Sequence, residues 1–74
     1  MNRIVVKPET LNGKPMIRNT RVSVQTVLEF LSNGDSIEDV LENYPTLTRD
    51  DVLACLKFAS RLMEHRYIIE PAGV

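Results

Sequence analysis

The run from residue 13 to residue 23, Gly-Lys-Pro-Met-Ile-Arg-Asn-Thr-Arg-Val-Ser, limits most strongly what this chain can fold into. Gly13 permits a backbone angle that other residues avoid, and Pro15 fixes the backbone angle two residues later. Met16, Ile17 and Val22 are interspersed with cations, so the apolar side chains can point inward while the charges stay outside. The run predicts a short, stiff β-turn-β element that presents positive charge.

Charge is distributed unevenly along the 74 residues, although the formal net charge is only −1. Residues 1–21 carry a net charge of +4, residues 22–56 carry −6, and residues 57–74 carry +1. The overall balance argues against a general nucleic-acid binder, but the basic arm is the part of the chain that would meet phosphates. The same asymmetry permits pairing between the arm of one chain and the acidic body of another.

Polar caps and apolar spacing predict three helices. Their expected bounds are Val24 to about Ser32, Ile37 to about Asn43, and from just after Thr48 to about His65. The expected N-caps are Ser23, Ser36 and Thr48. An aspartate follows each of the last two caps three residues later, which is typical of a capping box.

The residues before the first helix predict a β arm. Ile4-Val5-Val6 is a β-branched run followed by Pro8, which predicts a strand, and Asn12-Gly13 is a hairpin signal. Two short extended pieces are expected on either side of a turn at Asn19-Thr20. The predicted fold is therefore α+β and mainly α: a three-helix, homeodomain-like helix-turn-helix bundle preceded by a short N-terminal β arm. We expect one domain over residues 1–74, with the basic arm at 1–22, the bundle at 23–65 and a C-terminal tail at 66–74.

Several motifs of the chain together resemble the signature of a known family. They are Gly13-Lys14-Pro15, Ile17-Arg18, Thr20-Arg21, Ser36-Ile37-Glu38-Asp39 and Tyr44-Pro45-Thr46-Leu47-Thr48, within a span from roughly Arg3 to Met63. The family is a small bacterial and archaeal one, domain of unknown function four-three-three. Asn19 stands where the family usually has glycine, but asparagine also tolerates left-handed backbone angles, so we expect the turn to persist. The resemblance implies a VapB-like antitoxin of a type II toxin–antitoxin pair, which binds and silences a PIN-like ribonuclease toxin.

The basic arm supplies the candidate residues for binding duplex DNA, and through it for repression of the chain's own operon. They are Arg3, Lys7, Lys14, Arg18, Thr20 and Arg21. Strand ribbons enter DNA grooves in some dimeric repressors. The alternative is that Arg18 and Arg21 bind the acidic helices of their own chain or of a dimer mate. The third helix is a weaker candidate, because it begins with Arg49-Asp50-Asp51 and its carboxylates would repel phosphates.

The end of the chain supplies the candidate residues for binding a partner protein. They are Arg61, Arg66, Tyr67, Ile68 and Ile69. The resemblance implies that such a tail lies in the cleft of a toxin, and an extended segment can add a strand to a partner's sheet. The alternative is that Ile68-Ile69 pairs with the strand at Ile4–Val6, within the chain or across a dimer.

The small size of the chain predicts an oligomer or a bound partner, since a short domain buries little surface. We expect a homodimer in which the N-terminal strands contribute to the interface. A single cysteine, Cys55, is typical of the cytoplasm, and no apolar run is long enough to span a membrane. No nucleophile–base pair, phosphate loop or metal-ligand cluster is recognisable, so we expect neither an enzyme nor a cofactor. Two other functions stay open: a stand-alone DNA-binding regulator and a protein-interaction adaptor that binds no DNA.

Overall fold

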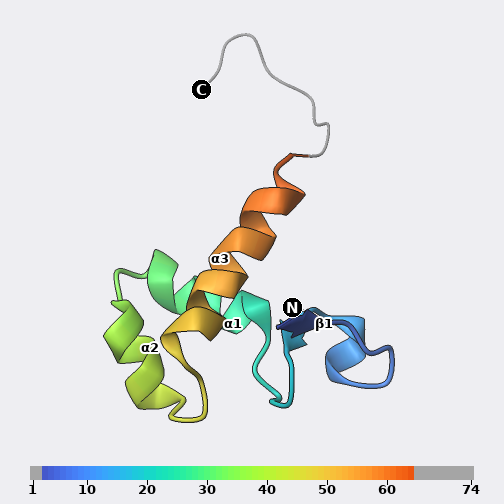
Figure 1. Ribbon diagram of the computed structural model, residues 1–74, viewed down its shortest axis with the longest axis horizontal. Coiled ribbons are helices and arrows are strands. Elements are labelled where there is room, and N and C mark those ends of the chain that lie inside the picture. The colour runs from blue at the N-terminus through green and yellow to red at the C-terminus, as the bar shows by residue number, and fades with distance from the viewer. Residues whose placement is uncertain (1–2, 65–74) are drawn as a thin grey trace, which may run out of the picture.

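The computed structural model describes residues 3–64 of the chain, and it has three helices preceded by two short strands. The strands are β1 (Ile4–Val5) and β2 (Met16–Ile17), and the helices are α1 (Val24–Ser32), α2 (Ile37–Asn43) and α3 (Arg49–Leu62) (Figure 1). The predicted α+β fold, mainly α with a short N-terminal hairpin, is confirmed. No helix in the described part of the chain is long and apolar enough to cross a bilayer.

The three predicted caps begin the three helices. The Ser23 hydroxyl accepts a hydrogen bond from the Thr26 N–H at 3.0 Å. At α2 and α3 the side chain of the cap accepts a hydrogen bond from the backbone N–H of the aspartate three residues later. The side chain of that aspartate accepts one from the backbone N–H of the cap. Because such caps satisfy N–H groups that have no partner inside the helix, they fix where each helix starts.

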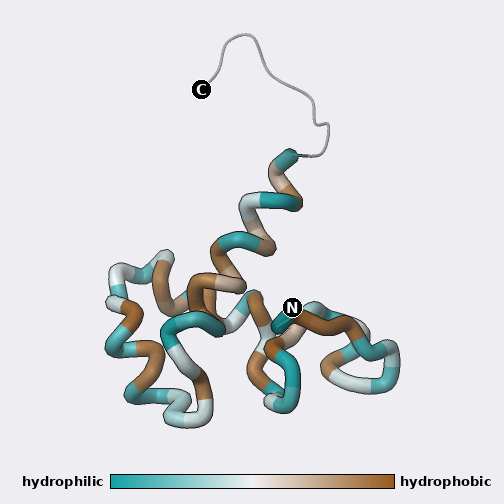
Figure 2. The backbone as a smooth tube through the Cα atoms, viewed as in Figure 1, coloured by the Kyte–Doolittle hydropathy of each residue, from teal (hydrophilic) through white to brown (hydrophobic). Residues whose placement is uncertain are grey.

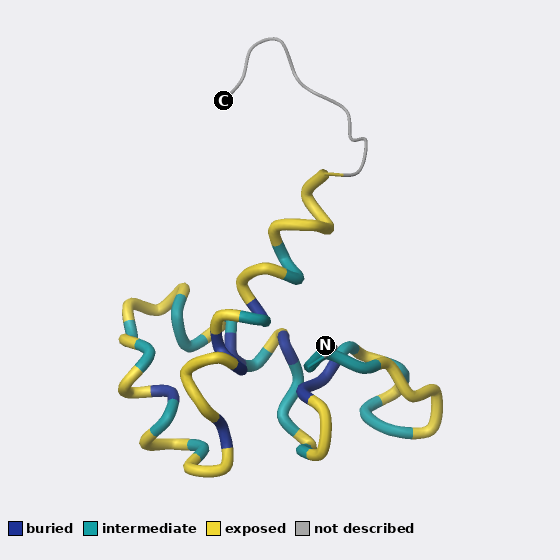
Figure 3. Tube along the Cα trace, viewed as in Figure 1, coloured by how far each residue is buried: buried dark blue, intermediate teal, exposed yellow. Residues whose placement is uncertain are grey.

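α3 is shorter than its apolar pattern predicts, since it ends at Leu62 and not near His65. The Met63 N–H is shared between the carbonyls of Ala59, Ser60 and Arg61, and the Glu64 N–H bonds only to Arg61 at 3.1 Å. Hydrogen bonds between residues three apart, as in a 3₁₀-helix, are common where an α-helix ends. The last turn of α3 lies beyond the packed bundle and is exposed (Figure 3).

The core lies where α1 contacts α2 and the first half of α3. Its buried residues are Ile17, Val24, Val27, Val40, Leu47, Val52 and Cys55. Most of these side chains are small, and each valine contributes about 1.5–3 kcal/mol by leaving water. A ring of half-buried residues surrounds this core, including Phe30 and Tyr44, whose rings meet edge to face at 5.8 Å. The domain thus depends on a small core, and the arm contributes to it through Ile17.

The arm is an antiparallel pair of strands with Ile4 opposite Ile17 and Val5 opposite Met16. The hairpin signal at Asn12-Gly13 does mark a turn, but that turn lies inside a long connection formed by residues 6–15. Leu11, Asn12 and Gly13 have consecutive positive φ angles of 53°, 55° and 77°. The positive φ of a leucine was not predicted, because no local pattern indicates it.

A second turn follows β2 and returns the chain to α1. The Ile17 N–H bonds to the Val22 carbonyl at 2.9 Å, and the Thr20 N–H bonds to the Ile17 carbonyl at 3.1 Å. Asn19 has a φ of 64°, so the expected tolerance of asparagine for a left-handed angle is confirmed. This turn holds Arg18 and Arg21 at the surface of the arm.

Candidate functional site

Arg3 attaches the arm to the start of α3. Its Nη1 lies 2.9 Å from Oδ1 of Asp51, and its Nη2 lies 3.7 Å from Oδ2 of Asp50. Pairing with an acidic helix was the alternative for Arg18 and Arg21, whereas Arg3 was a candidate for DNA contact. Arg3 and Asp51 are separated by 48 in residue number, so no local pattern predicts this pair.

Two other candidates for DNA contact have their polar atoms engaged within the chain. The Thr20 hydroxyl donates to the Ile17 carbonyl at 2.7 Å and accepts from the Val22 N–H at 3.0 Å. Thr20 therefore closes the turn after β2. The Lys14 ammonium donates to Oε1 of Gln25 on α1, at 3.4 Å. Lys7, Arg18 and Arg21 are exposed as Lys14 is, and the arm presents these cations at its surface.

The start of α3 is unsuited to a DNA duplex. Asp50 is largely exposed there, and Asp51 carries a charge held in place by its neighbours. Burial pushes the pKa of Asp51 upward, but hydrogen bonds from Thr48 and Arg3 outweigh it, so the pKa of this carboxyl lies below the ordinary value. The first cation of the helix, Arg49, lies 3.4 Å from Oε2 of Glu38 on α2. The position that reads bases in helix-turn-helix proteins is thus anionic here.

Cys55 is a core residue. Its side chain is fully buried, and burial together with the charge of Asp51 raises the pKa of its thiol to about 11. A thiol in this state is a poor nucleophile and a poor metal ligand. No group of three or more potential metal-ligating side chains occurs among residues 3–64.

Hydrophobic and hydrophilic residues alternate along α3 (Figure 2), and large apolar side chains are exposed on one side of this helix and of its C-cap Met63. They are Leu53, Leu56 and Met63, with exposed fractions of 43%, 41% and 61%, and we call them the α3 stripe. The helical repeat places the three residues on one flank of the helix. Because soluble monomers seldom expose apolar groups together, the α3 stripe is a candidate contact surface.

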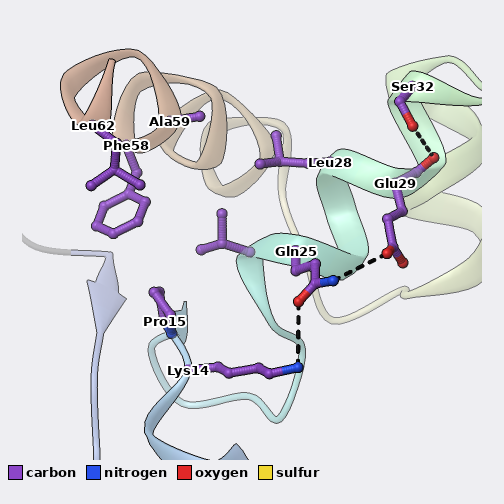
Figure 4. A pocket seen from close by; sticks show the side chains of 10 residues that line it. Lys14, Pro15, Gln25, Leu28, Glu29, Ser32, Phe58, Ala59 and Leu62 are labelled. Atoms are coloured by element: carbon purple, nitrogen blue, oxygen red, sulfur yellow. Dashed lines mark hydrogen bonds between the residues drawn. The ribbon is translucent and has the colours of Figure 1, made fainter. Parts of the chain in front are cut away.

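A groove lies between α1 and the second half of α3, with a volume of about 480 Å³ (Figure 4). Its walls are mainly apolar and are formed by Pro15, Val24, Leu28, Phe58, Ala59 and Leu62. One rim is polar: Lys14 donates to Gln25, which in turn donates to Oε2 of Glu29 at 3.2 Å. We call this feature the α1–α3 groove. The groove could not be predicted from the sequence, because it depends on how far α3 extends beyond α1.

The candidate residues for partner binding fall mostly beyond the part of the chain that the structure describes. Arg61 is exposed on the last turn of α3. Arg66, Tyr67, Ile68 and Ile69 lie outside the described residues, so their suggested contact with a toxin or with β1 stays a prediction. Within residues 3–64, the strand at Ile4–Val5 pairs with Met16–Ile17.

Comparison with known proteins agrees with the motif resemblance. The chain is 35% identical over 49 residues to "Uncharacterized protein y4eO" of Sinorhizobium fredii, a match that covers 66% of this chain but only 22% of that protein. A crystal structure of a DUF433 member from Anabaena variabilis superposes with a TM-score of 0.80 at 33% identity, covering 86% of this chain and 63% of that one. The chain thus spans about a fifth of the first relative and under two thirds of the second. Since residues 4–59 also match the family described as "Protein of unknown function (DUF433)", the chain belongs to the DUF433 family.

Proposed function

We propose that the protein is the antitoxin of a type II toxin–antitoxin pair, and that it neutralises a PIN-like ribonuclease by binding it. The observation that carries the proposal is the exposed α3 stripe on a helix that extends past the bundle. The polypeptide continues from the end of this helix into the segment that contains Tyr67, Ile68 and Ile69. The α3 stripe offers an apolar surface to a partner, and the apolar residues of the following segment could extend the contact. The identity of that partner rests on the resemblance of the sequence motifs.

The properties of α3 favour a protein as its partner. Desolvation of a leucine or methionine side chain contributes about 1.5–3 kcal/mol, whereas contact with DNA depends on cations. The α3 stripe has the apolar side chains that contact with a protein needs. The start of α3 has carboxylates, which oppose contact with DNA. An antitoxin that acts by occupying its target needs no catalytic group of its own, so we propose a non-enzymatic, stoichiometric role.

The test is inhibition of the host's own PIN-like ribonuclease by the full chain, measured as cleavage of a labelled RNA at increasing ratios of the two proteins. We expect complete inhibition near one-to-one. The double variant L56D/M63D should lose inhibition, because two carboxylates would have to be buried in the contact. The matched control is V6D, which places the same charge at an apolar position of the arm that is 57% exposed.

Two results would contradict the proposal. One is a wild-type chain that neither binds the ribonuclease nor slows RNA cleavage. The other is a variant L56D/M63D that inhibits as well as V6D does, which would leave the α3 stripe without a role. Circular dichroism of each variant distinguishes a lost contact from a lost fold.

A second candidate function, repression of the operon by DNA binding, is favoured by the arm. Lys7, Arg18 and Arg21 are exposed on it, and the acidic residues of the chain lie mainly in the helices. The alternative of an adaptor that binds no DNA predicts that duplex DNA is ignored at all salt concentrations.

A further inference from the structure

We propose that the α1–α3 groove is the dimer interface of this protein, and that its occupant is the end of α3 from a second copy. The inference does not depend on the antitoxin function, since it uses the groove and not the α3 stripe. A two-fold interface has to be complementary to itself, because each copy presents the same patch.

The patch contains both a hollow and the side chain that would fill it. The groove has an apolar volume of about 480 Å³ between α1 and α3, and Leu62 stands on its edge with 52% of its surface exposed. Leu28 and Phe58 lie across the groove from each other (Figure 4). A leucine from a second copy would enter the groove of the first, while Leu62 of the first enters the groove of the second. Each copy would then cover an apolar surface that is open to water in the single chain.

Charges of both signs border the patch: Lys14 and Glu29 lie on its α1 rim, where the Lys14 ammonium donates to Gln25. Glu29 lies on the α1 rim, where its carboxylate accepts a hydrogen bond from Gln25. Arg61 lies next to Leu62 at the end of α3 and is exposed. When Leu62 enters the partner's groove, Arg61 comes to the rim that carries the partner's Glu29. The two-fold symmetry repeats this contact, so the dimer has two such charge pairs, and both favour the same orientation of the two copies.

Because the core of the single chain is small, contact with a second copy would add to the stability of the fold. Among residues 3–64 the buried cluster has seven members, and a domain of this size buries a small share of its surface on folding. Association with a second copy adds buried apolar area, and the stability then depends on protein concentration by mass action. This interface differs from the one expected from the sequence, which used the N-terminal strands.

The test measures the mass of the full chain in solution by sedimentation equilibrium over a range of concentrations. We expect about twice the chain mass of 8.4 kDa. The variant L62D should be monomeric, with a melting temperature that no longer rises with concentration. L53D is the matched control, since it places the same charge on the opposite side of α3 and should leave the dimer intact.

Charge reversal tests the orientation with variants at exposed positions that leave the core unchanged. E29R and R61E should each weaken self-association several-fold, and the double variant E29R/R61E should restore it. A wild-type chain that is monomeric throughout, a dimer that survives L62D, or a double variant no stronger than the single ones would overturn the proposal. A dimer that is lost in V6D but kept in L62D would also overturn the proposal and place the interface on the arm. A dimer that is lost in L53D but kept in L62D would place it on the α3 stripe.

Discussion

Among single residues, Gly13 shows that a glycine can be needed for its backbone angle alone. A Cβ at this position would lie 3.9 Å from Cα of Pro8, which is an ordinary contact, so there is room for a side chain. The constraint is the φ of +77°, which residues that have a Cβ rarely adopt. The glycine requirement was predictable from the sequence, but the two preceding positive φ angles, at Leu11 and Asn12, depend on the path of the whole connection.

We expect Gly13→Ala to lower the free energy of unfolding by about 1–2 kcal/mol, the cost of a left-handed angle for a residue with a Cβ. Gly13→Val should lower the free energy of unfolding further, because the valine side chain branches at Cβ. Urea denaturation followed by circular dichroism measures both. Lys14→Ala is the neighbouring control, since Lys14 has an ordinary φ of −75°. Equal stability of the wild type and Gly13→Ala would show that the turn relaxes without cost.

At the scale of elements, the helices could be predicted and the way the arm attaches to them could not. Ser23, Ser36 and Thr48 act on residues three positions away, so their pattern is visible in the sequence. Arg3 and Asp51 meet only when β1 reaches the start of α3. The apolar spacing of α3 predicted a helix, but it could not tell Val52, which is buried, from Leu53, which is exposed.

The attachment of β1 to α3 should weaken in acid. The pKa of Asp51 in the folded chain lies below its ordinary value of 3.8, so its stabilising effect is complete above that pH and is lost as the pH falls through the folded pKa. We expect Asp51→Asn to cost about 1–2 kcal/mol at neutral pH, as the loss of a helix cap does. The difference from wild type should shrink below pH 3.8.

Urea denaturation at a series of pH values measures this difference in the free energy of unfolding. Asp50→Asn is the matched control, because that carboxylate is 72% exposed and lies 3.7 Å from Arg3. Its effect should be smaller at every pH, since solvent screens an exposed pair. A gap between wild type and Asp51→Asn that stays constant into acid would mean that the carboxylate charge contributes nothing to the attachment.

In the described part of the chain, residues 3–64, the charge separation is reduced where Arg3 meets the start of α3. The sequence predicted a basic arm beside an acidic body, and folding places Arg3 of the arm against Asp50 and Asp51 of the body. Lys7, Lys14, Arg18 and Arg21 remain exposed on the arm. Which cation would be neutralised could not be predicted, because all five cations of the arm look alike in the sequence.

This distribution predicts how the chain would bind duplex DNA in its role as an operon repressor. Each phosphate contact adds about 0.9 to the slope of log affinity against log salt. Lys7→Gln/Arg21→Gln should therefore weaken binding and reduce the slope by about 2, measured by fluorescence anisotropy on a labelled duplex. Lys57→Gln/Arg61→Gln removes the same two charges from α3 and should leave the slope unchanged, because these cations belong to α3 and not to the arm. An equal reduction in both double variants would mean that net charge alone governs binding, and affinity that does not change with salt would exclude the arm as a phosphate-binding surface.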